Sequence, residues 1–336
     1  MSGILLVDKS GGMTSHDVVA RARRALGTRR VGHAGTLDPM ATGLLVLGVG
    51  SATRLLTFLV GLDKSYLATI RLGVATDSDD ADGAVTAERD ATDLPEERIR
   101  AALAEQVGDR DQVPSTVSAI KVDGRRAYER ARAGERVELA ARRVRIEAID
   151  VLAVRRAGAR VDVEVRVDCS SGTYVRAIAR DAGARLGVGG HLTALRRTRV
   201  GPLDVGAAVG VGAIAPAALL APAAVATALF PRRALDAAEA LALGQGKRVP
   251  VGRISGAGHA VPGHAVPVGG APDGPIAAIG PDGVLVGIAE RHGDTLRPIA
   301  NFPRADAPTA DALATDVAGA DARAADARAP GPGERP

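Results

Sequence analysis

Strict alternation of apolar and charged residues constrains the fold of this chain more than any other feature of its sequence. Residues 160–169 read RVDVEVRVDC, and residues 64–73 read KSYLATIRLG. Such period-two alternation is typical of a β-strand with one face on a hydrophobic core and the other on solvent. The apolar positions of the first segment are Val161, Val163, Val165, Val167 and Cys169. Both segments therefore predict long strands of the antiparallel type.

Helical periodicity appears between the strand segments. Residues 16–26 and 174–186 each carry an apolar stripe at helical spacing, and Ser15 and Thr173 stand before them. We expect these two hydroxyl residues to cap the helices. The sequence DLPEE, residues 93–97, has the spacing of a capping box before a further helix over residues 97–107. Helices mixed with antiparallel strands predict an α+β fold.

Composition excludes several classes of protein. The sequence is 46% hydrophobic but only 2% aromatic, so aliphatic side chains must build the core. A single cysteine excludes a disulfide framework and a cysteine-based zinc site. The first residues, MSGILLVDKSGG, lack the basic segment and long apolar run of a signal peptide, and no apolar stretch is long enough to span a membrane. We therefore expect a cytoplasmic protein.

Three parts can be distinguished along the chain. Residues 1–230 are expected to form one domain, interrupted by a basic insertion at about residues 112–139. Residues 231–303 contain short strand-like pieces between Gly and Pro turns, which predicts a small β-barrel-like domain. Residues 304–336 are rich in Ala, Asp and Pro without an apolar period, so we expect a disordered tail.

The charge of the chain is unevenly distributed. The formal net charge is +4, and residues 304–336 carry four basic and six acidic side chains, which leaves +6 on the rest. A moderate basic excess suits a polyanionic partner such as a nucleic acid, although many basic enzymes bind none.

One carboxylate occupies an unusual position. The segment RRVGHAGTLDPMATGLLVLGVG, residues 29–50, places Asp38 in a polar loop before an apolar strand, immediately ahead of Pro39. A residue before proline is driven towards extended conformations, so Asp38 should stand outside regular hydrogen-bonded structure. Its carboxylate could simply close an Asx turn, or it could be a reactive group.

Two other motifs have simpler interpretations. The sequence DSDDADG, residues 77–83, lacks the ligand and glycine positions of a calcium loop, and we interpret it as a solvated turn. The sequence LLVLGVGSAT, residues 44–53, lacks the third glycine and the later acidic residue of a dinucleotide-binding motif.

Five segments together resemble one family. They are GILLVDKSGGMTSHDVV, RRVGHAGTLDPMATGLLVLGVGSATR, DKSYLATIRLGVATDSDDADG, VSAIKVDGRRAYERAR and CSSGTYVRAIARDAGARLGVGGHLTALRRTRVG. In this order they resemble the bacterial tRNA pseudouridine synthases of the TruB family, over most of residues 3–201. The resemblance implies a pseudouridine-synthase sheet core, mixed or antiparallel, flanked by helices. The C-terminal part is closest to a PUA-like RNA-binding domain, and this likeness is weaker.

The resemblance also implies an activity. Members of the family are isomerases that convert uridine 55 in the T loop of tRNA to pseudouridine after flipping the base out of the loop. The reaction gains and loses no atoms, so no cofactor and no metal is expected. A carboxylate that adds covalently to the substrate divides one difficult step into two.

The family motifs assign roles to individual residues. By family position, Asp38 is the nucleophile, and Arg176 should pair with it, fix it in place and lower its pKa. Lys9 is expected to pack near this loop in a structural role. The remaining substrate-binding set is His33, which occupies the space left by the flipped base, Tyr66, which stacks on the base, Tyr174, which lines the pocket, and Leu195, which provides an apolar wall.

The expected partner is the T stem-loop of tRNA. Basic residues precede the catalytic loop and recur in the insertion, which we interpret as a thumb that closes on the RNA. They are Arg21, Arg23, Arg24, Arg29 and Arg30, and Lys121, Arg125, Arg126, Arg130 and Arg132. We expect a monomer with no obligate protein partner. The alternatives are an RNA-binding module without chemistry, and the same chemistry on another RNA within a guide-RNA particle.

Overall fold

The computed structural model describes residues 1–115, 121–122, 125–126, 140–256 and 274–303, with backbone alone at 121–122 and 125–126. The chain separates into two compact units, Met1–Phe302 and Pro303–Pro336. The expected tail and most of the expected insertion lie outside the described residues.

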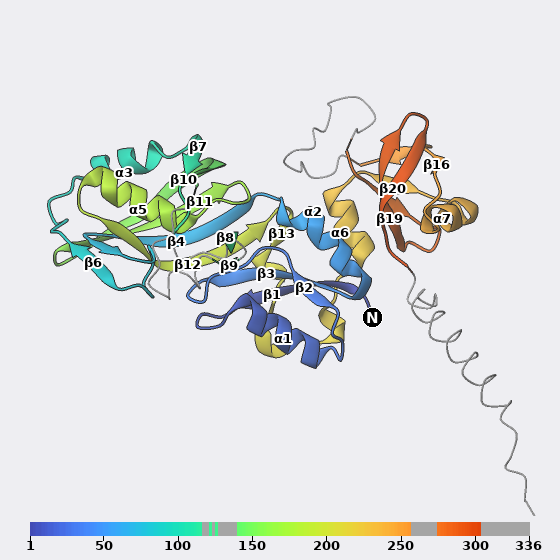
Figure 1. Cartoon of the computed structure of the whole chain (residues 1–336), viewed down its shortest axis with the longest axis horizontal. Helices are drawn as coiled ribbons and strands as arrows, with labels where there is room; N and C mark the ends of the chain where they lie inside the picture. The colour runs from blue at the N-terminus through green and yellow to red at the C-terminus, as the bar shows by residue number, and fades with distance from the viewer. Residues whose placement is uncertain (116–120, 123–124, 127–139, 257–273, 304–336) are drawn as a thin grey trace, which may run out of the picture. The chain divides into compact units, whose positions relative to one another are not determined.

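A large mixed sheet forms the centre of the first unit (Figure 1). Among the described residues it has ten strands, eight of them in the order β14-β1-β3-β12-β4-β11-β10-β7, while β13 pairs with β12 and β2 with β3. The strands are β1 (Gly3–Lys9), β2 (Val31–His33), β3 (Thr42–Val49), β4 (Lys64–Leu72), β7 (Gly108–Gln112), β10 (Arg142–Ala157), β11 (Arg160–Cys169), β12 (Gly190–Val200), β13 (Leu203–Asp204) and β14 (Val209–Gly210).

The two alternating segments are neighbours in this sheet. Strand β4 pairs antiparallel with β11, so that Tyr66 lies opposite Val167 and Ile70 opposite Val163. These inward positions are buried, whereas the other face carries cross-strand ion pairs such as Arg71 with Asp162. The predicted α+β class and the antiparallel strands are confirmed.

Helices cover the sheet. Helices α3 and α5 pack against each other, with α5 on β12 and β4 and α3 on β10. The helices are α1 (Ser15–Ala25), α2 (Leu56–Val60), α3 (Glu96–Ala104), α5 (Val175–Leu186), α6 (Pro222–Leu229) and α7 (Ala237–Gly244), with the 3-10 helices η1 (Gly50–Leu55), η2 (Val205–Ala207), η3 (Val211–Ala213) and η4 (Pro216–Ala218). Among the described residues, no helix is long and apolar enough to cross a membrane.

The helix caps differ from those expected. Thr14, not Ser15, caps α1 and forms a capping box with Asp17. Helix α5 begins one residue later than expected, with Tyr174 at the N-cap and no side-chain capping bond, so Thr173 is not the cap. Helix α3 has Pro95 at its N-cap and likewise no side-chain capping bond. Ser15 is thereby available for a tertiary contact.

A second sheet lies towards the C-terminal end. Its order is β16-β20-β19-β18-β15-β17. The strands are β15 (Arg232–Ala234), β16 (Val249–Pro250), β17 (Ile254–Ser255), β18 (Ile276–Ile279), β19 (Leu285–His292) and β20 (Thr295–Asn301). Strands β16 and β17 lie at opposite edges, yet four Cα steps join Pro250 to Ile254 and span only about 14 Å. A flat six-stranded sheet would separate its edges by about 24 Å, so this sheet must curl into a partial barrel.

Two short hairpins complete the described chain. Strands β5 (Val74–Thr76) and β6 (Val85–Glu88) form one hairpin, which encloses the acidic segment. Strands β8 (Lys121–Val122) and β9 (Arg125–Arg126) form the other, in the region of the expected insertion.

Candidate active site

The loop that carries Asp38 lies between β2 and β3 and is held on both sides. The Ser15 hydroxyl donates to the Leu37 carbonyl at 3.1 Å and accepts from the Leu37 N–H at 2.9 Å. The Asp38 carbonyl accepts a bond from the Ala41 N–H at 3.1 Å and so closes a turn. Because the backbone of Asp38 closes this turn, its carboxylate is available to another partner.

Lys9 also holds the same loop, through hydrogen bonds to backbone carbonyls. It is fully buried, and its Nζ donates to the carbonyls of Ser10 at 3.0 Å, Met13 at 2.8 Å and Pro39 at 3.2 Å. Burial lowers the pKa of Lys9, and the negative charge of Asp38 opposes that shift. Lys9 thus fixes the backbone that follows Asp38, in the structural position expected from the sequence.

The Asp38 carboxylate forms an ion pair with Arg176 from the first turn of α5. Arg176 Nε lies 3.1 Å from Asp38 Oδ2, and the arginine is almost completely buried. Its Nη1 donates to Asp80 Oδ2 at 3.0 Å and to the Ser78 carbonyl at 2.8 Å. The pairing expected between positions 38 and 176 is present, but the guanidinium is shared with a second carboxylate.

Burial shifts the pKa of Asp38 more than its arginine partner does. Surrounding protein atoms desolvate the carboxylate and raise its pKa, although 36% of the side chain remains exposed. Arg176 acts in the opposite direction, and the negative charge of Asp80 raises the pKa further. Arg176 thus lowers the pKa of Asp38 as expected, but desolvation outweighs this effect and the net shift is upward.

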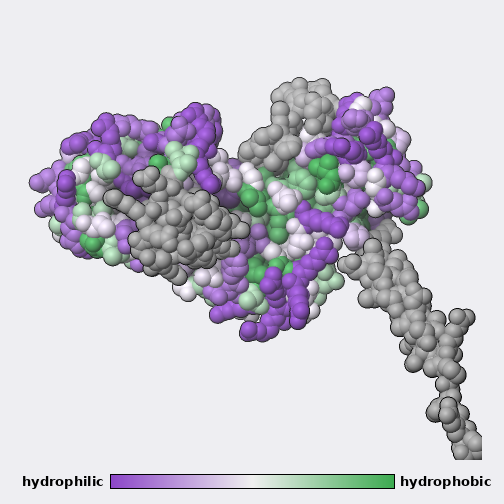
Figure 2. Space-filling view, viewed as in Figure 1, coloured by the Kyte–Doolittle hydropathy of each residue, from purple (hydrophilic) through white to green (hydrophobic). Residues whose placement is uncertain are grey.

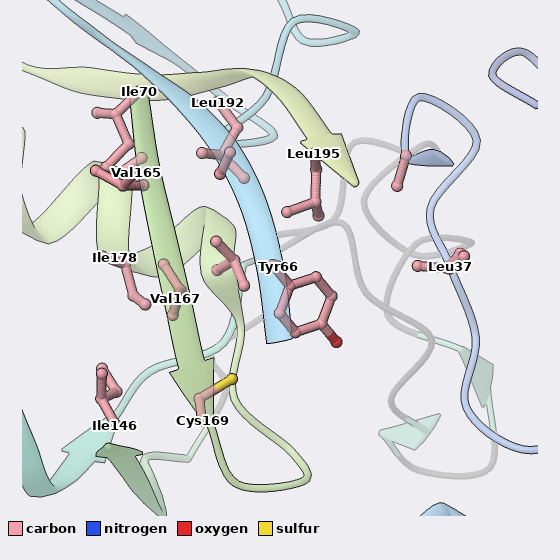
Figure 3. Close-up of a cluster of buried hydrophobic side chains, with 14 of the residues drawn as sticks. Leu37, Tyr66, Ile70, Ile146, Val165, Val167, Cys169, Ile178, Leu192 and Leu195 are labelled. Carbon is pink, nitrogen blue, oxygen red and sulfur yellow. The ribbon is translucent and has the colours of Figure 1, made fainter. Parts of the chain in front are cut away.

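Tyr66 and Leu195 are buried on the neighbouring strands β4 and β12. Each is only 8% exposed, and both belong to the main hydrophobic core together with Leu37. Figure 3 shows the Tyr66 ring near the start of β4, below Leu195, with its hydroxyl on the side of the loop that carries Leu37. Burial raises the pKa of Tyr66, and the charge of Arg197 opposes this shift.

His33 lies on β2, which precedes the loop that carries Asp38, and Tyr174 directly precedes helix α5, which carries Arg176. The ring of His33 packs edge-on against His16 of α1, with 5.7 Å between ring centroids, and its buried Nδ1 has no hydrogen bond within the described chain. Burial lowers the pKa of His33. Tyr174 precedes α5, where the Gln112 side chain accepts from its N–H at 2.8 Å and donates to its carbonyl at 3.1 Å.

The acidic segment after β5 is not the solvated turn expected from its composition. Ser78, Asp79 and Asp80 are all buried, and both carboxylates pair with arginines of α5. A sequence signal exists, since the two arginines lie four residues apart on one helix face and two consecutive acids can match them. No spacing rule connects segments about 100 residues apart, so the sequence reasoning missed this contact.

Arg197 is a second group that the sequence reasoning missed. It is 1% exposed, and it donates from Nε to the Leu44 carbonyl at 2.7 Å and from Nη2 to the Gly35 carbonyl at 3.0 Å. It therefore ties the start of the loop that carries Asp38 to β12. The residues that the structure describes contain no cluster of His, Cys, Asp and Glu that could hold a metal ion.

Comparison with protein families gives two matches in sequence. Residues 23–175 match the N-terminal domain of the TruB family of pseudouridylate synthases, and residues 176–240 match the C-terminal domain of tRNA pseudouridylate synthase B. A tRNA pseudouridine synthase B from Leifsonia xyli is 53% identical over 307 residues, covering 90% of this chain and 97% of the relative. One from Mycolicibacterium paratuberculosis is 55% identical over 293 residues, covering 87% and 94%.

Solved structures share the fold at low sequence identity. An H/ACA ribonucleoprotein bound to a substrate RNA containing 2'-deoxyuridine matches with a TM-score of 0.65 and 23% identity, over 90% of this chain and 86% of the other. The archaeal box H/ACA Nop10–Cbf5 complex matches with a TM-score of 0.64 and 24% identity, over 90% and 87%.

Proposed function

The chain belongs to the TruB family of pseudouridylate synthases, and on this premise we propose that it converts uridine 55 in the T loop of tRNA to pseudouridine through a covalent intermediate on Asp38. The observation that carries the proposal is the ion pair between Asp38 and Arg176 of α5. Asp38 follows Leu37, which belongs to the same hydrophobic cluster as Tyr66 and Leu195. An apolar wall next to one partly exposed carboxylate suits a flipped base and its sugar.

The chemistry needs few groups. A C–N glycosidic bond breaks, a C–C bond forms to the same sugar, one proton leaves carbon and one is gained by nitrogen. The ionised Asp38 carboxylate supplies the nucleophile that holds the intermediate, and Arg176 fixes its orientation. Tyr66 stacks on the base, Leu195 excludes water from its edge, and Tyr174 lines the same pocket. This scheme requires no cofactor and no metal.

RNA binding follows from charge and from base flipping. Extruding a base costs a few kcal/mol, which stacking and phosphate contacts offset. Arg21 and Arg24 are exposed on α1, beside the helix turn that carries His16, and hydrophilic side chains cover the region around α1 in Figure 2. In this proposal His33 fills the space left by the flipped base. The thumb arginines belong to a segment whose side chains are not described.

The domain assignment remains part of the proposal. Residues 1–230 would form the catalytic domain with a thumb at about 112–139, and residues 231–303 a PUA-like RNA-binding domain. The curled sheet β15–β20 supports the second assignment. We further propose that the protein acts as a cytoplasmic monomer on the T stem-loop.

Substitution of the proposed nucleophile tests this function. Asp38→Asn preserves volume and hydrogen bonding, but an amide is a very poor nucleophile. We expect pseudouridine formation in a tRNA transcript to fall below detection, while tRNA affinity changes by less than about tenfold.

The proposal fails if the Asp38→Asn protein converts uridine at near the parent rate. Asp38 would then be a turn residue only. A parent protein that binds tRNA without forming pseudouridine would instead favour the RNA-binding module without chemistry.

A further inference from the structure

Helix α5 presents two arginines to the acidic segment after β5. Arg176 and Arg180 lie one helical turn apart, so their side chains leave the same face. Arg176 Nη1 lies 3.0 Å from Asp80 Oδ2, and Arg180 Nη1 lies 3.1 Å from Asp79 Oδ2. Two consecutive carboxylates are thus bound by two arginines four residues apart.

The backbone of Asp79 makes this arrangement possible. Its φ of 61° lies in the left-handed region, and no other non-glycine residue in the described ranges has a positive φ. Residues other than glycine rarely adopt this backbone conformation, and it persists where surrounding contacts fix it. The Asp79 carbonyl accepts a bond from the Leu192 N–H at 3.0 Å, and only 10% of the Asp79 side chain is exposed. The segment is therefore held against β12 and α5 together.

Arg180 also holds a third segment. Its Nη2 donates to the Val113 carbonyl at 2.8 Å, and its Nε donates to Asp181 Oδ1 at 2.9 Å. Val113 follows Gln112, whose side chain makes two hydrogen bonds to the backbone of Tyr174. Arg180 therefore connects α5, the turn with Asp79 and the segment that follows β7.

We propose that Arg180, acting through Asp79, is a positioning residue for the reaction at Asp38. By fixing the turn, the Arg180–Asp79 pair sets where Asp80 meets Arg176, and so sets the direction in which Arg176 presents its Nε to Asp38. Arg180 acts through these residues and does not touch the substrate. This inference rests on the proposed function and extends it by one ion pair.

Single-turnover kinetics test the inference. We expect Arg180→Gln to lower the rate of pseudouridine formation by about tenfold to a hundredfold, since small misplacements of reacting groups have effects of this size. Affinity for tRNA should stay within about threefold of the parent value. The matched control is Arg185→Gln, which removes an exposed ion pair with Glu105 from the same helix and should leave the rate unchanged.

Three further variants separate positioning from simple loss of folding. Asp79→Asn tolerates the left-handed backbone, because asparagine adopts it more readily than most residues. If the pair acts as a unit, the double variant Asp79→Asn with Arg180→Gln should be no slower than the slower single variant. Arg180→Lys, which keeps the charge but cannot reach both acceptors, should recover part of the rate. All rates are compared at matched folded fraction.

Specific results would overturn the inference. They are a parent-like rate for Arg180→Gln, an equal loss for Arg185→Gln, or rate losses that multiply in the double variant. These outcomes differ from failure of the proposed function, in which the parent itself forms no pseudouridine or Asp38→Asn retains the parent rate.

Discussion

Asp38 combines two opposing influences on one carboxylate. Protein atoms around it withdraw water and disfavour the charged form, whereas Arg176 stabilises that form. Because Arg176 also binds Asp80, its charge is divided between two acids. The ionised form is the nucleophile in the proposed reaction, so the balance between burial and Arg176 sets how much of that form is present at a given pH.

The acid limb of the pH–rate profile should report this balance. A raised pKa means that Asp38 loses its charge, and the enzyme its activity, as the pH falls through a value above the ordinary aspartate pKa of about 3.9. Asp80→Asn removes a charge that raises the pKa and frees Arg176 for Asp38, so the limb should move to lower pH. Single-turnover rates between about pH 4 and pH 8 measure the acid limb of the parent protein and of the Asp80→Asn variant. An upward movement would contradict this electrostatic scheme.

Arg176→Lys separates charge from geometry. Lysine keeps a positive charge but lacks the planar fork that reaches Asp38, Asp80 and the Ser78 carbonyl together. We expect a large fall in turnover without complete loss, and a change in tRNA affinity of less than about tenfold. A parent-like rate would show that charge alone suffices at this position.

At the scale of elements, the pairing of β3 with β12 positions the loop that carries Asp38. The two strands pair in parallel only at Thr42 with Arg196 and at Gly43 with Arg197. Gly43 has a φ of 96°, and a Cβ on it would lie 2.2 Å from the Arg197 carbonyl oxygen. This close approach places Arg197 beneath the loop, where it binds the Gly35 carbonyl.

Two glycine substitutions separate the cost of a left-handed backbone from the cost of a steric clash with a neighbouring strand. Gly27→Ala, at a φ of 62° with open space around it, should cost only the left-handed conformation, about 1–2 kcal/mol. Gly43→Ala adds a collision with backbone and should destabilise by more than about 3 kcal/mol or prevent folding. Urea unfolding of both variants measures the difference. Equal losses would mean that the strands can separate at little cost.

The thumb assignment predicts a change in salt dependence. Neutralising Arg125 and Arg126 together should reduce the slope of log affinity for tRNA against log salt by up to about two units, one for each arginine that binds a phosphate. Arg155 and Arg166, which form ion pairs on the outward sheet face, provide a control pair that should leave the slope unchanged. An unchanged slope in the Arg125 and Arg126 variant would show that these two arginines do not bind RNA phosphates and would contradict the thumb assignment.

The elements differ in how far the sequence could predict them. Alternation sufficed for β4 and β11, because burial of one face is a local periodic property. The α5 cap could not be read from Thr173, since the Gln112 side chain binds the Tyr174 backbone from a distant segment. The burial of Asp79 could not be predicted for the same reason, because its arginine partner lies 101 residues further along the chain. Pairing of Asp38 with Arg176 could be predicted only through the family motifs.

At the scale of the whole molecule, one hydrophobic cluster joins parts that composition separates. Strands β1 and β3 are buried on both faces, and their second face packs in a cluster with α6 and the curled sheet. Ile4 and Leu6 belong to this cluster together with Ile279, Ile288 and Phe302. A boundary at residue 230, as composition suggests, would therefore cut through a shared core.

Two truncations distinguish a shared core from an independent domain and from a dispensable tail. Deleting residues 304–336 removes a segment with no apolar period and a net charge of −2, and the described core ends at Phe302. We expect the Tm to change by less than about 5 °C, equivalent to about 1–2 kcal/mol for a protein of this size, and activity to be nearly unchanged.

Ending the chain at residue 230 instead exposes the apolar surface that Ile279, Ile288 and Phe302 cover, and should lower the Tm by more than about 5 °C or cause aggregation. Calorimetry of both truncations beside the full chain decides the matter. An unchanged Tm for the chain ending at residue 230 would mean that the two parts fold independently, and a large loss on removing only residues 304–336 would give the tail a packing role.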